Sequence, residues 1–216
     1  MVPAPPRDRL GPEILFAATL IGLFVVAQVT DQWLFHHVVY SGIYDHGWGR
    51  MLRDAGYLPV WALVGTALVL QDWVPRAGRA FGRATRRGLL LFGSAATGGA
   101  VAEVLKLTFR RERPGLTDGV HVFRPWSDHP FSTAELGLPS SEAAVAFAAA
   151  AALARLFPES SLLWYMLAGG CALTRVASGA HFVSDVVLAA LVGYLAALSL
   201  WRRRSPRSGA VSEGDA

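Results

Sequence analysis

The chain has 216 residues, which is enough for one domain or for two very small ones. Hydrophobic residues make up 53% of it and charged residues 17%, whereas soluble domains carry about 25% charged residues. This composition excludes a disordered protein, argues against an ordinary soluble domain and favours a membrane protein. We therefore assign the net charge of +4 to loops on the cytoplasmic face of a membrane and expect no nucleic-acid partner.

Six apolar segments follow one another along the chain, and a membrane-spanning helix needs about 20 such residues. They cover residues 14–29, 58–74, 88–109, 143–157, 162–177 and 182–201, of which the fourth and fifth are short. The first could be a signal peptide, but Thr30-Asp31-Gln32-Trp33 follows it instead of a small-residue cleavage site. The sequence therefore predicts an all-α integral membrane bundle of six transmembrane helices, with little or no sheet.

Arginines in the short loops predict the orientation of this bundle. They are Arg7 and Arg9 before the first segment, Arg76, Arg79, Arg83, Arg86 and Arg87 between the second and third, and Arg202, Arg203, Arg204 and Arg207 after the sixth. With six spans these regions share one side, so we expect both termini in the cytoplasm, in a bacterial inner membrane. We predict one domain over residues 1–204 and a disordered cytoplasmic tail at 205–216.

The opposite side carries charged residues that this rule does not explain. Arg110, Arg111, Arg113 and Arg124 lie in the loop after the third segment, where a function would account for their retention. Lys106 is the only lysine among the 20 basic residues, which also favours a function. Glu103 precedes it by one helical turn and can pair with it.

Charged groups at membrane depth are costly and usually functional, and here they gather at the ends of four segments. Lys106 lies about two turns before Arg113, on the same face if the helix persists, and Pro114 marks the exit from the helix. Ser140-Ser141-Glu142, after Pro139, begins the fourth segment, where free N–H groups offer an anion site.

A basic residue and a histidine–aspartate pair complete this set. Arg175 ends the fifth segment, and His181 and Asp185 lie four residues apart, on one helical face. The carboxylate can hold one ring nitrogen and leave the other free as nucleophile or base. Three cations, a helix N-terminus and an oriented histidine together predict a site that handles phosphate.

In these residues the chain resembles the type 2 phosphatidic acid phosphatases, membrane relatives of the vanadium haloperoxidases. Lys106, Arg113 and Pro114 match the motif K-x6-R-P. Thr174-Arg175, His181 and Asp185 match S-R-x5-H-x3-D, with threonine in place of serine. Pro139-Ser140-Ser141-Glu142 matches P-S-G-H only in part.

The resemblance implies that a lipid phosphate monoester or pyrophosphate is hydrolysed on the periplasmic side through a phosphohistidine at His181, steadied by Asp185. Lys106, Arg113 and Arg175 would bind the phosphate oxygens, and Ser140 and Ser141 would add hydrogen bonds. It implies no metal and no cofactor. The expected partners are the lipid substrate and membrane lipids, and the oligomeric state is left open.

Glu142 is the main departure, because the family has a histidine there as the acid that protonates the leaving group. Burial favours a protonated glutamate, whereas the three cations favour the carboxylate, and the sequence leaves this open. Three functions therefore remain: a lipid phosphatase, a lipid phosphotransferase, and a non-catalytic descendant that binds or transports lipid phosphates.

Other combinations are less favoured. Ser140, His181 and Asp185 could form a hydrolase triad, but no nucleophile elbow surrounds the serine. The spacing of His121, Asp128 and His129 matches no strong metal-ligand pattern. Cys171, the single cysteine, lies in an apolar run and is expected to be a small core residue.

Overall fold

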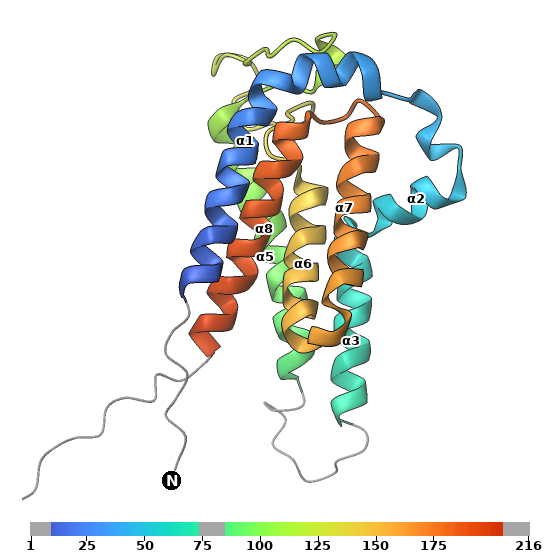
Figure 1. Ribbon diagram of the computed structural model, residues 1–216, viewed down its shortest axis with the longest axis vertical. Helices are drawn as coiled ribbons and strands as arrows, with labels where there is room; N and C mark the ends of the chain where they lie inside the picture. Colours follow the sequence, from blue (N-terminus) through green and yellow to red (C-terminus); the bar gives the residue numbers. More distant parts are fainter. Residues whose placement is uncertain (1–9, 74–84, 205–216) are drawn as a thin grey trace, which may run out of the picture.

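The computed structural model describes residues 10–73 and 85–204 (Figure 1). The α-helices in these ranges are α1 (Leu10–Val38), α2 (Gly47–Asp54), α3 (Leu58–Trp73), α5 (Arg86–Phe109), α6 (Ser141–Leu156), α7 (Ser161–Ala177) and α8 (Val183–Arg204). Short 3-10 helices cover Ser41–Tyr44, Pro114–Leu116 and Pro158–Ser160. The described residues hold no β-strand, only two isolated bridges.

Each of the six predicted segments is a helix, which confirms the all-α prediction. The sequence did not predict the short helix α2, and it ended the first helix at residue 29, nine residues too early. The predicted tail at 205–216 and the loop arginines Arg76, Arg79 and Arg83 lie outside the described residues.

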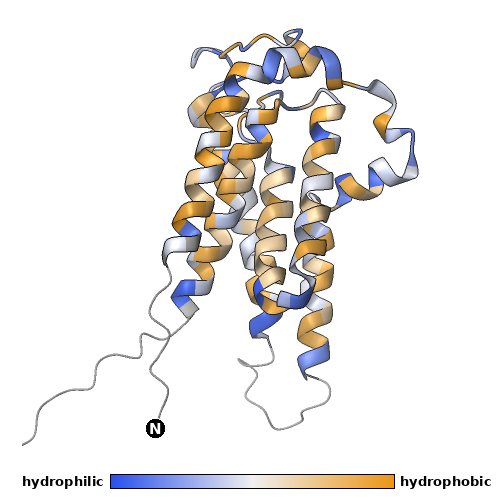
Figure 2. Cartoon of the chain, in the orientation of Figure 1, coloured by the Kyte–Doolittle hydropathy of each residue, from blue (hydrophilic) through white to orange (hydrophobic). Residues whose placement is uncertain are grey.

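Within residues 10–73 and 85–204, three helices are long and apolar enough to cross a membrane: Glu13–Val38, Arg86–Phe109 and Val183–Arg203. Together they make this chain a membrane protein. The apolar part of α1 is only 6% buried and that of α8 is 61% buried, so α1 lies at the periphery and α8 near the centre. Apolar residues run along the helices, and hydrophilic ones concentrate towards the two ends of the bundle (Figure 2). The helix α3 is shorter, with 16 residues.

The helix α6 lies at the centre of the bundle, in contact with α5, α7 and α8. Small side chains let helix backbones approach closely, which matters where lipid removes the hydrophobic drive between helices. A Cβ atom at Gly98 of α5 would lie 2.9 Å from the Ala148 Cβ, and one at Gly193 of α8 only 2.5 Å from the Ala144 oxygen. The alanine-rich sequence of α6 thus sets the spacing of its neighbours.

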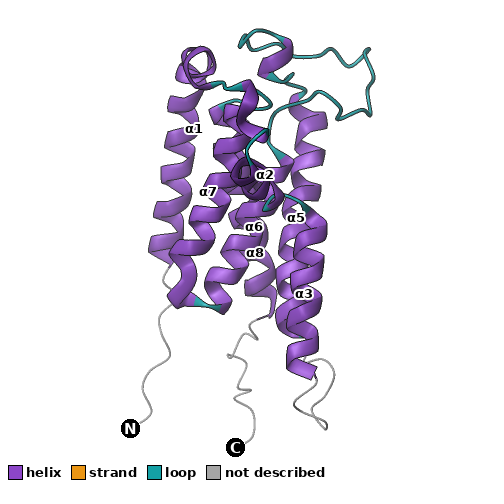
Figure 3. Ribbon diagram, turned by 90° about the vertical axis from the view of Figure 1, so that its right-hand side faces the viewer, coloured by secondary structure: helices purple, strands orange, loops and turns teal. Residues whose placement is uncertain are grey.

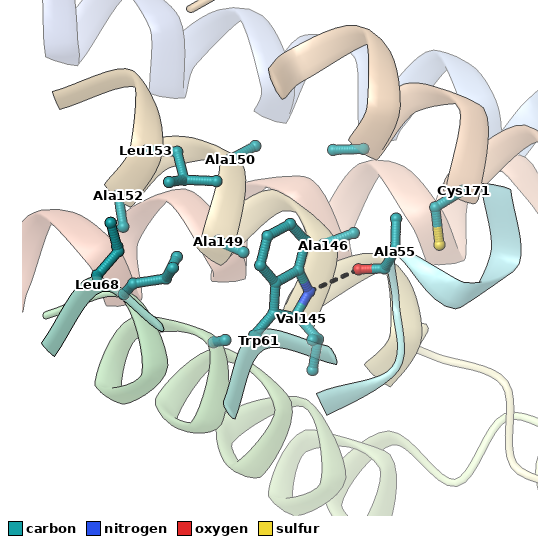
Figure 4. Close-up of a cluster of buried hydrophobic side chains, with 13 residues drawn as sticks. Ala55, Trp61, Leu68, Val145, Ala146, Ala149, Ala150, Ala152, Leu153 and Cys171 are labelled. Atoms are coloured by element: carbon teal, nitrogen blue, oxygen red, sulfur yellow. Dashed lines mark hydrogen bonds between the residues drawn. The ribbon is translucent and has the colours of Figure 1, made fainter. Parts of the chain in front are cut away.

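Trp61 connects α3 to this centre. Its ring is buried in the apolar cluster that includes Val145 and Ala149 of α6, and its Nε1 donates to the Ala55 carbonyl at 2.7 Å (Figure 4). The buried Cys171 belongs to the same cluster, as the sequence predicts.

The loop between α5 and α6 covers one end of the bundle. The first residues of α1 and the last residues of α8 lie at the opposite end (Figure 3). Arg110 ends α5 in the left-handed conformation, with φ 56°. Its buried guanidinium donates to the carbonyls of Arg124, Pro125 and Pro130, and it lies 4.8 Å from the Trp126 ring. Arg110 therefore organises the loop that lies next to the predicted site.

Candidate active site

The predicted site residues come together where four helices meet. The C-terminal ends of α5 and α7 carry Lys106 and Arg175, and the N-terminal ends of α6 and α8 carry Glu142 and Asp185. His181 lies in the turn between α7 and α8. Residues 75 or more positions apart in the sequence thus share one end of the bundle.

His181 is 1% exposed. Its Nδ1 lies 3.0 Å from the Gly137 carbonyl oxygen and 3.5 Å from Asp185 Oδ2. Since both partners can only accept when the aspartate is ionised, Nδ1 carries the proton and the lone pair of a neutral ring is on Nε2. Nε2 is buried, has no hydrogen-bond partner among the described residues and lies 3.7 Å from Glu142 Oε2. This is the geometry of an oriented nucleophile or base.

Asp185 is buried, and both of its carboxylate oxygens accept hydrogen bonds. Its Oδ2 accepts the Phe182 N–H at 2.8 Å, and its Oδ1 pairs with Arg111. The absence of a side chain at Gly137 is necessary here, because a Cβ atom would lie 2.9 Å from Asp185 Oδ2. His181 and Asp185 were expected on one face of a helix, but α8 begins only at Val183. His181 therefore lies in the turn before the helix, and its contact with Asp185 spans the start of α8.

Lys106 and Arg175 bring positive charge to the site. Lys106 Nζ donates to Ser141 Oγ at 2.9 Å and to Glu103 at 2.8 Å, so Glu103 makes the contact that its spacing from Lys106 allows. Arg175 Nη2 lies 3.3 Å from Glu142 Oε1. The Nε atom of Arg175 is buried without a partner in the described part of the chain. Both cations are almost fully buried, which strengthens their interaction with an anion.

Arg113 was expected on the same helical face as Lys106 only if the helix continued that far, and it does not. The helix α5 ends at Phe109, because Arg110 turns the backbone into the left-handed region. Arg113 therefore lies in the following loop, where its N–H pairs with the Glu135 carbonyl at 2.9 Å and its Nε is 3.5 Å from the Leu136 carbonyl. No contact between described residues joins its guanidinium to Lys106 or His181.

Ser140 and Ser141 begin α6 as the motif suggested, with different tasks. The buried Ser140 is the N-cap: its Oγ accepts the Ala143 N–H at 3.4 Å, and its own N–H donates to the Asp185 carbonyl at 3.2 Å. Ser141 Oγ accepts from Lys106. Ser140 thus ties α6 to α8, and Ser141 ties α6 to α5.

Glu142 is the most open of the residues around the histidine, with 28% of its side chain exposed. One carboxylate oxygen faces Arg175 and the other faces His181 Nε2. The carboxylate therefore occupies the space between a cation and a potential nucleophile, which is where a bound phosphate would have to lie or to approach. The unpartnered nitrogens of His181 and Arg175 bound the same space.

The alternative metal site does not assemble. No group of three or more potential metal-ligating side chains lies together among the described residues. His121 instead lies 3.2 Å from Asp31 and packs edge-on against Phe182, while Asp128 and His129 pair with each other.

Four residues outside the predicted set support the site. They are Tyr44, whose hydroxyl accepts from Arg175 at 3.1 Å, and Asp31, Gln28 and Arg111, which surround the far side of Asp185. No motif marks Tyr44, Asp31 or Gln28. The only signal for Arg111 was an arginine kept on the side where arginine is uncommon.

Known proteins match this chain in sequence and in fold. The family model of the PAP2 superfamily matches residues 87–208, more than half of the chain. Lipid A 1-phosphatases of Rhizobium etli and Rhizobium johnstonii are each 35% identical to it over 102 residues. That region is 46% of this chain but only 43% and 41% of the two relatives, so the match covers less than half of their length.

A solved structure extends the similarity beyond the matched region. The PAP2-type phosphatidylglycerolphosphate phosphatase of Bacillus subtilis, a transmembrane protein, has a similar fold with a TM-score of 0.57 at 17% identity. The superposition covers 89% of this chain and 98% of that one. The family match, on a helical fold with the family's motif residues at one end, shows that the chain belongs to the PAP2 superfamily.

Proposed function

We propose that the protein is a membrane phosphatase that hydrolyses a lipid phosphate monoester or pyrophosphate through a phosphohistidine intermediate on His181. One observation carries the proposal. Nδ1 of the buried ring is held by Gly137 and Asp185, which leaves Nε2 free beside Glu142 and Arg175. Two buried cations, Lys106 and Arg175, suit a phosphate better than a neutral ester.

In the first step, the Nε2 lone pair forms a bond to the terminal phosphorus while the bond from that phosphorus to the leaving oxygen breaks. This oxygen belongs to the lipid alcohol in a monoester and to the lipid monophosphate in a pyrophosphate. Lys106 and Arg175 hold phosphate oxygens and stabilise the charge that develops on them, with Arg113 as a third donor. Asp185 steadies the positive imidazole. The Ser140 cap and the Ser141 hydroxyl keep the start of α6 in place.

Glu142 replaces the family's histidine as the proton carrier. It gives a proton to the leaving lipid oxygen, and its carboxylate then takes one from the water that attacks the phosphohistidine. The bond from nitrogen to phosphorus breaks in this second step, and inorganic phosphate leaves. When the substrate phosphate binds Arg175, the Glu142 carboxylate loses its cationic partner and takes up a proton from water, and it donates this proton in the first step.

The substrate is proposed to be a lipid whose head group ends in phosphate. The curated relatives act on lipid A and the solved structure on phosphatidylglycerolphosphate, as their names say, and both are lipids with a terminal phosphate. Glu142 and Glu103, the latter with 42% of its side chain exposed, are the open side of the site. A head group entering past them would keep its tails in the bilayer.

The topology is part of the proposal. Residues 1–204 form one domain in which all six helices α1, α3, α5, α6, α7 and α8 cross a bacterial inner membrane. Both termini lie in the cytoplasm and the site faces the periplasm. The arginines at the start of α5 and at the end of α8 support this orientation.

The test is phosphate release by the purified protein in detergent. The substrates are phosphatidic acid, phosphatidylglycerolphosphate, a polyprenyl pyrophosphate and lipid A 1-phosphate. We expect release from at least one lipid, its loss in His181→Ala, and retention in His37→Ala, which changes an exposed histidine of α1. We expect Glu142→Gln to slow turnover about 100-fold or more and Glu142→His to keep it.

A second candidate is a phosphate-binding descendant without turnover, favoured by the existing contact between Glu142 and Arg175. Folded wild-type protein that releases no phosphate from any lipid, but gains release in Glu142→His, would establish it. Transfer to an acceptor lipid, the third possibility, appears as a phosphorylated product when the acceptor is added.

A further inference from the structure

Asp185 belongs to a buried ionic cluster that lies mostly outside the family's motifs. Arg111 donates to Asp185, to Ser184 Oγ at 2.6 Å and to Gln28 at 3.0 Å, and its Nη1 lies 3.8 Å from Asp31. Asp31 in turn accepts the Ser184 N–H at 3.0 Å and the Ser184 hydroxyl. Helix α1 is thereby connected to the start of α8 directly beside the candidate nucleophile.

These groups are as buried as the apolar core. Arg111, Ser184 and Asp185 are fully buried, and Asp31 is 1% exposed. Removing charges from water costs several kcal/mol per ion unless partners and hydrogen bonds compensate. Two carboxylates here share one guanidinium, so the charge of Asp185 depends on both Arg111 and Asp31.

We propose that Arg111 and Asp31 are positioning residues that fix the orientation of Asp185 and set how strongly its charge acts on His181. The proposal rests on the proposed function, in which His181 reacts through Nε2. Both residues lie outside the known motifs. Asp31 is in α1, outside the part of the chain that the family model matches.

Orientation follows from how the carboxylate oxygens are used. Arg111 takes Oδ1, which leaves Oδ2 for the Phe182 N–H and for His181 Nδ1. Without the guanidinium, the carboxylate could rotate, and Nδ1 would lose a fixed partner. Gln28 and Ser184 hold the guanidinium itself in place.

The charges of Arg111 and Asp31 act on the protonation of His181, because electrostatic interactions are strong in a buried site. An aspartate without Arg111 would favour a protonated imidazole, whose Nε2 has no lone pair to attack phosphorus. Arg111 offsets this effect, and Asp31 partly offsets Arg111. The two residues therefore act on His181 with opposite signs.

The other charged groups near His181 are the same in every variant proposed below. Lys106 of α5, Glu142 of α6 and Arg175 of α7 face the open side of the ring. His121 of the covering loop lies against Asp31. A change in behaviour between variants thus reports on Arg111 and Asp31.

The experiment compares the pH dependence of kcat/KM in wild type, Arg111→Met, Arg111→Lys and Asp31→Asn. Arg111→Met should move the acid limb to higher pH and Asp31→Asn to lower pH, each by roughly one unit, or about tenfold in proton affinity. Arg111→Lys keeps the positive charge and should therefore leave the acid limb close to its wild-type position. The double variant Arg111→Met with Asp31→Asn removes both charges together and should return the limb towards the wild-type position.

A matched control is Arg124→Met, which removes another buried arginine from the same loop. Arg124 pairs with Glu112 and Glu135 and touches no residue of the cluster, so it should alter stability without moving the limb. Limbs that stay in place, or that move in the same direction in Arg111→Met and Asp31→Asn, would overturn the proposal.

A second readout separates this proposal from the proposed function. The NMR titration of the His181 imidazole, assigned by its loss in His181→Ala, should show the same two opposite shifts even in protein that releases no phosphate. An inactive wild type with opposite shifts would refute the phosphatase and keep the positioning role. A wild type that releases phosphate, with variants that lack the two opposite shifts, would support the phosphatase and refute the positioning role. If Arg111→Met does not fold, the His181 imidazole of Asp31→Asn must still titrate at lower pH than that of wild type.

Discussion

At the scale of single residues, Tyr44 shows how a side chain outside every motif supports one inside. Its hydroxyl accepts from Arg175 Nη1 at 3.1 Å and is within reach of the Thr174 carbonyl at 3.2 Å and Ser178 Oγ at 3.3 Å. Because a hydroxyl has one proton but can accept two hydrogen bonds, it can donate to α7 and accept from the arginine together. Tyr44 thus holds one branch of the guanidinium, and the other branch, which faces Glu142, is the one proposed to bind the phosphate.

We expect Tyr44→Phe to raise KM for a lipid phosphate about fivefold to tenfold, since it removes one hydrogen bond to a charged group. The effect on kcat should be smaller, because the remaining branch still reaches the phosphate. Steady-state kinetics on the best substrate of the panel would measure both constants. Tyr57→Phe, which changes an exposed tyrosine, should alter neither; equal effects in the two variants would show that the hydroxyl of Tyr44 has no special role.

The sequence predicted the residues proposed to bind the phosphate but not the residues that hold them in place. Lys106, Arg175, His181 and Asp185 lie in spaced motifs, and the structure brings them together. The partners Tyr44 and Asp31 lie 131 and 153 positions from Arg175 and Ser184, so no local pattern could identify them. The sequence could not show that a single left-handed residue, Arg110, ends the helix before Arg113.

At the scale of elements, the spacing between α6 and α8 decides the geometry of the site. The helix α6 begins at Ser141 and α8 at Val183, so each helix carries part of the site at its N-terminal end. At Gly193 the backbone of α8 lies directly against the backbone of α6, with no room for a Cβ atom between them. The sequence predicted both helices, but an alanine-rich segment alone does not say which neighbour lies against which face.

We expect Gly193→Ala to lower the free energy of unfolding by about 1–3 kcal/mol, as overpacked cores do. The added Cβ would lie 2.5 Å from the Ala144 oxygen and 2.7 Å from the Ala148 nitrogen, so α8 must move away from α6. Turnover should fall too, because His181 and Glu142 would separate. Gly93→Ala is the control, since its Cβ would meet only Leu200, at 3.6 Å; denaturant unfolding in detergent should find it no less stable than wild type.

At the scale of the whole molecule, hydropathy located the helices but misjudged their polar residues. Thr30, Asp31 and Gln32 were interpreted as the end of the first helix, yet α1 continues to Val38 and Asp31 is buried against α8. A hydropathy pattern cannot distinguish a polar residue that faces water from one that faces a buried arginine.

The helices α6 and α7 have 16 and 17 residues, or roughly 25 Å at the α-helical rise, against a hydrocarbon core of about 30 Å. We expect both to cross, with Arg155 near the end of α6 reaching the interface. Single cysteines in a Cys171→Ser background test this in cells with a membrane-impermeant maleimide. Phe131→Cys, in the covering loop, should react in intact cells, whereas Glu159→Cys and Arg203→Cys should react only after permeabilisation. Reaction of Glu159→Cys together with Phe131→Cys would mean that α6 and α7 enter and leave on the same side.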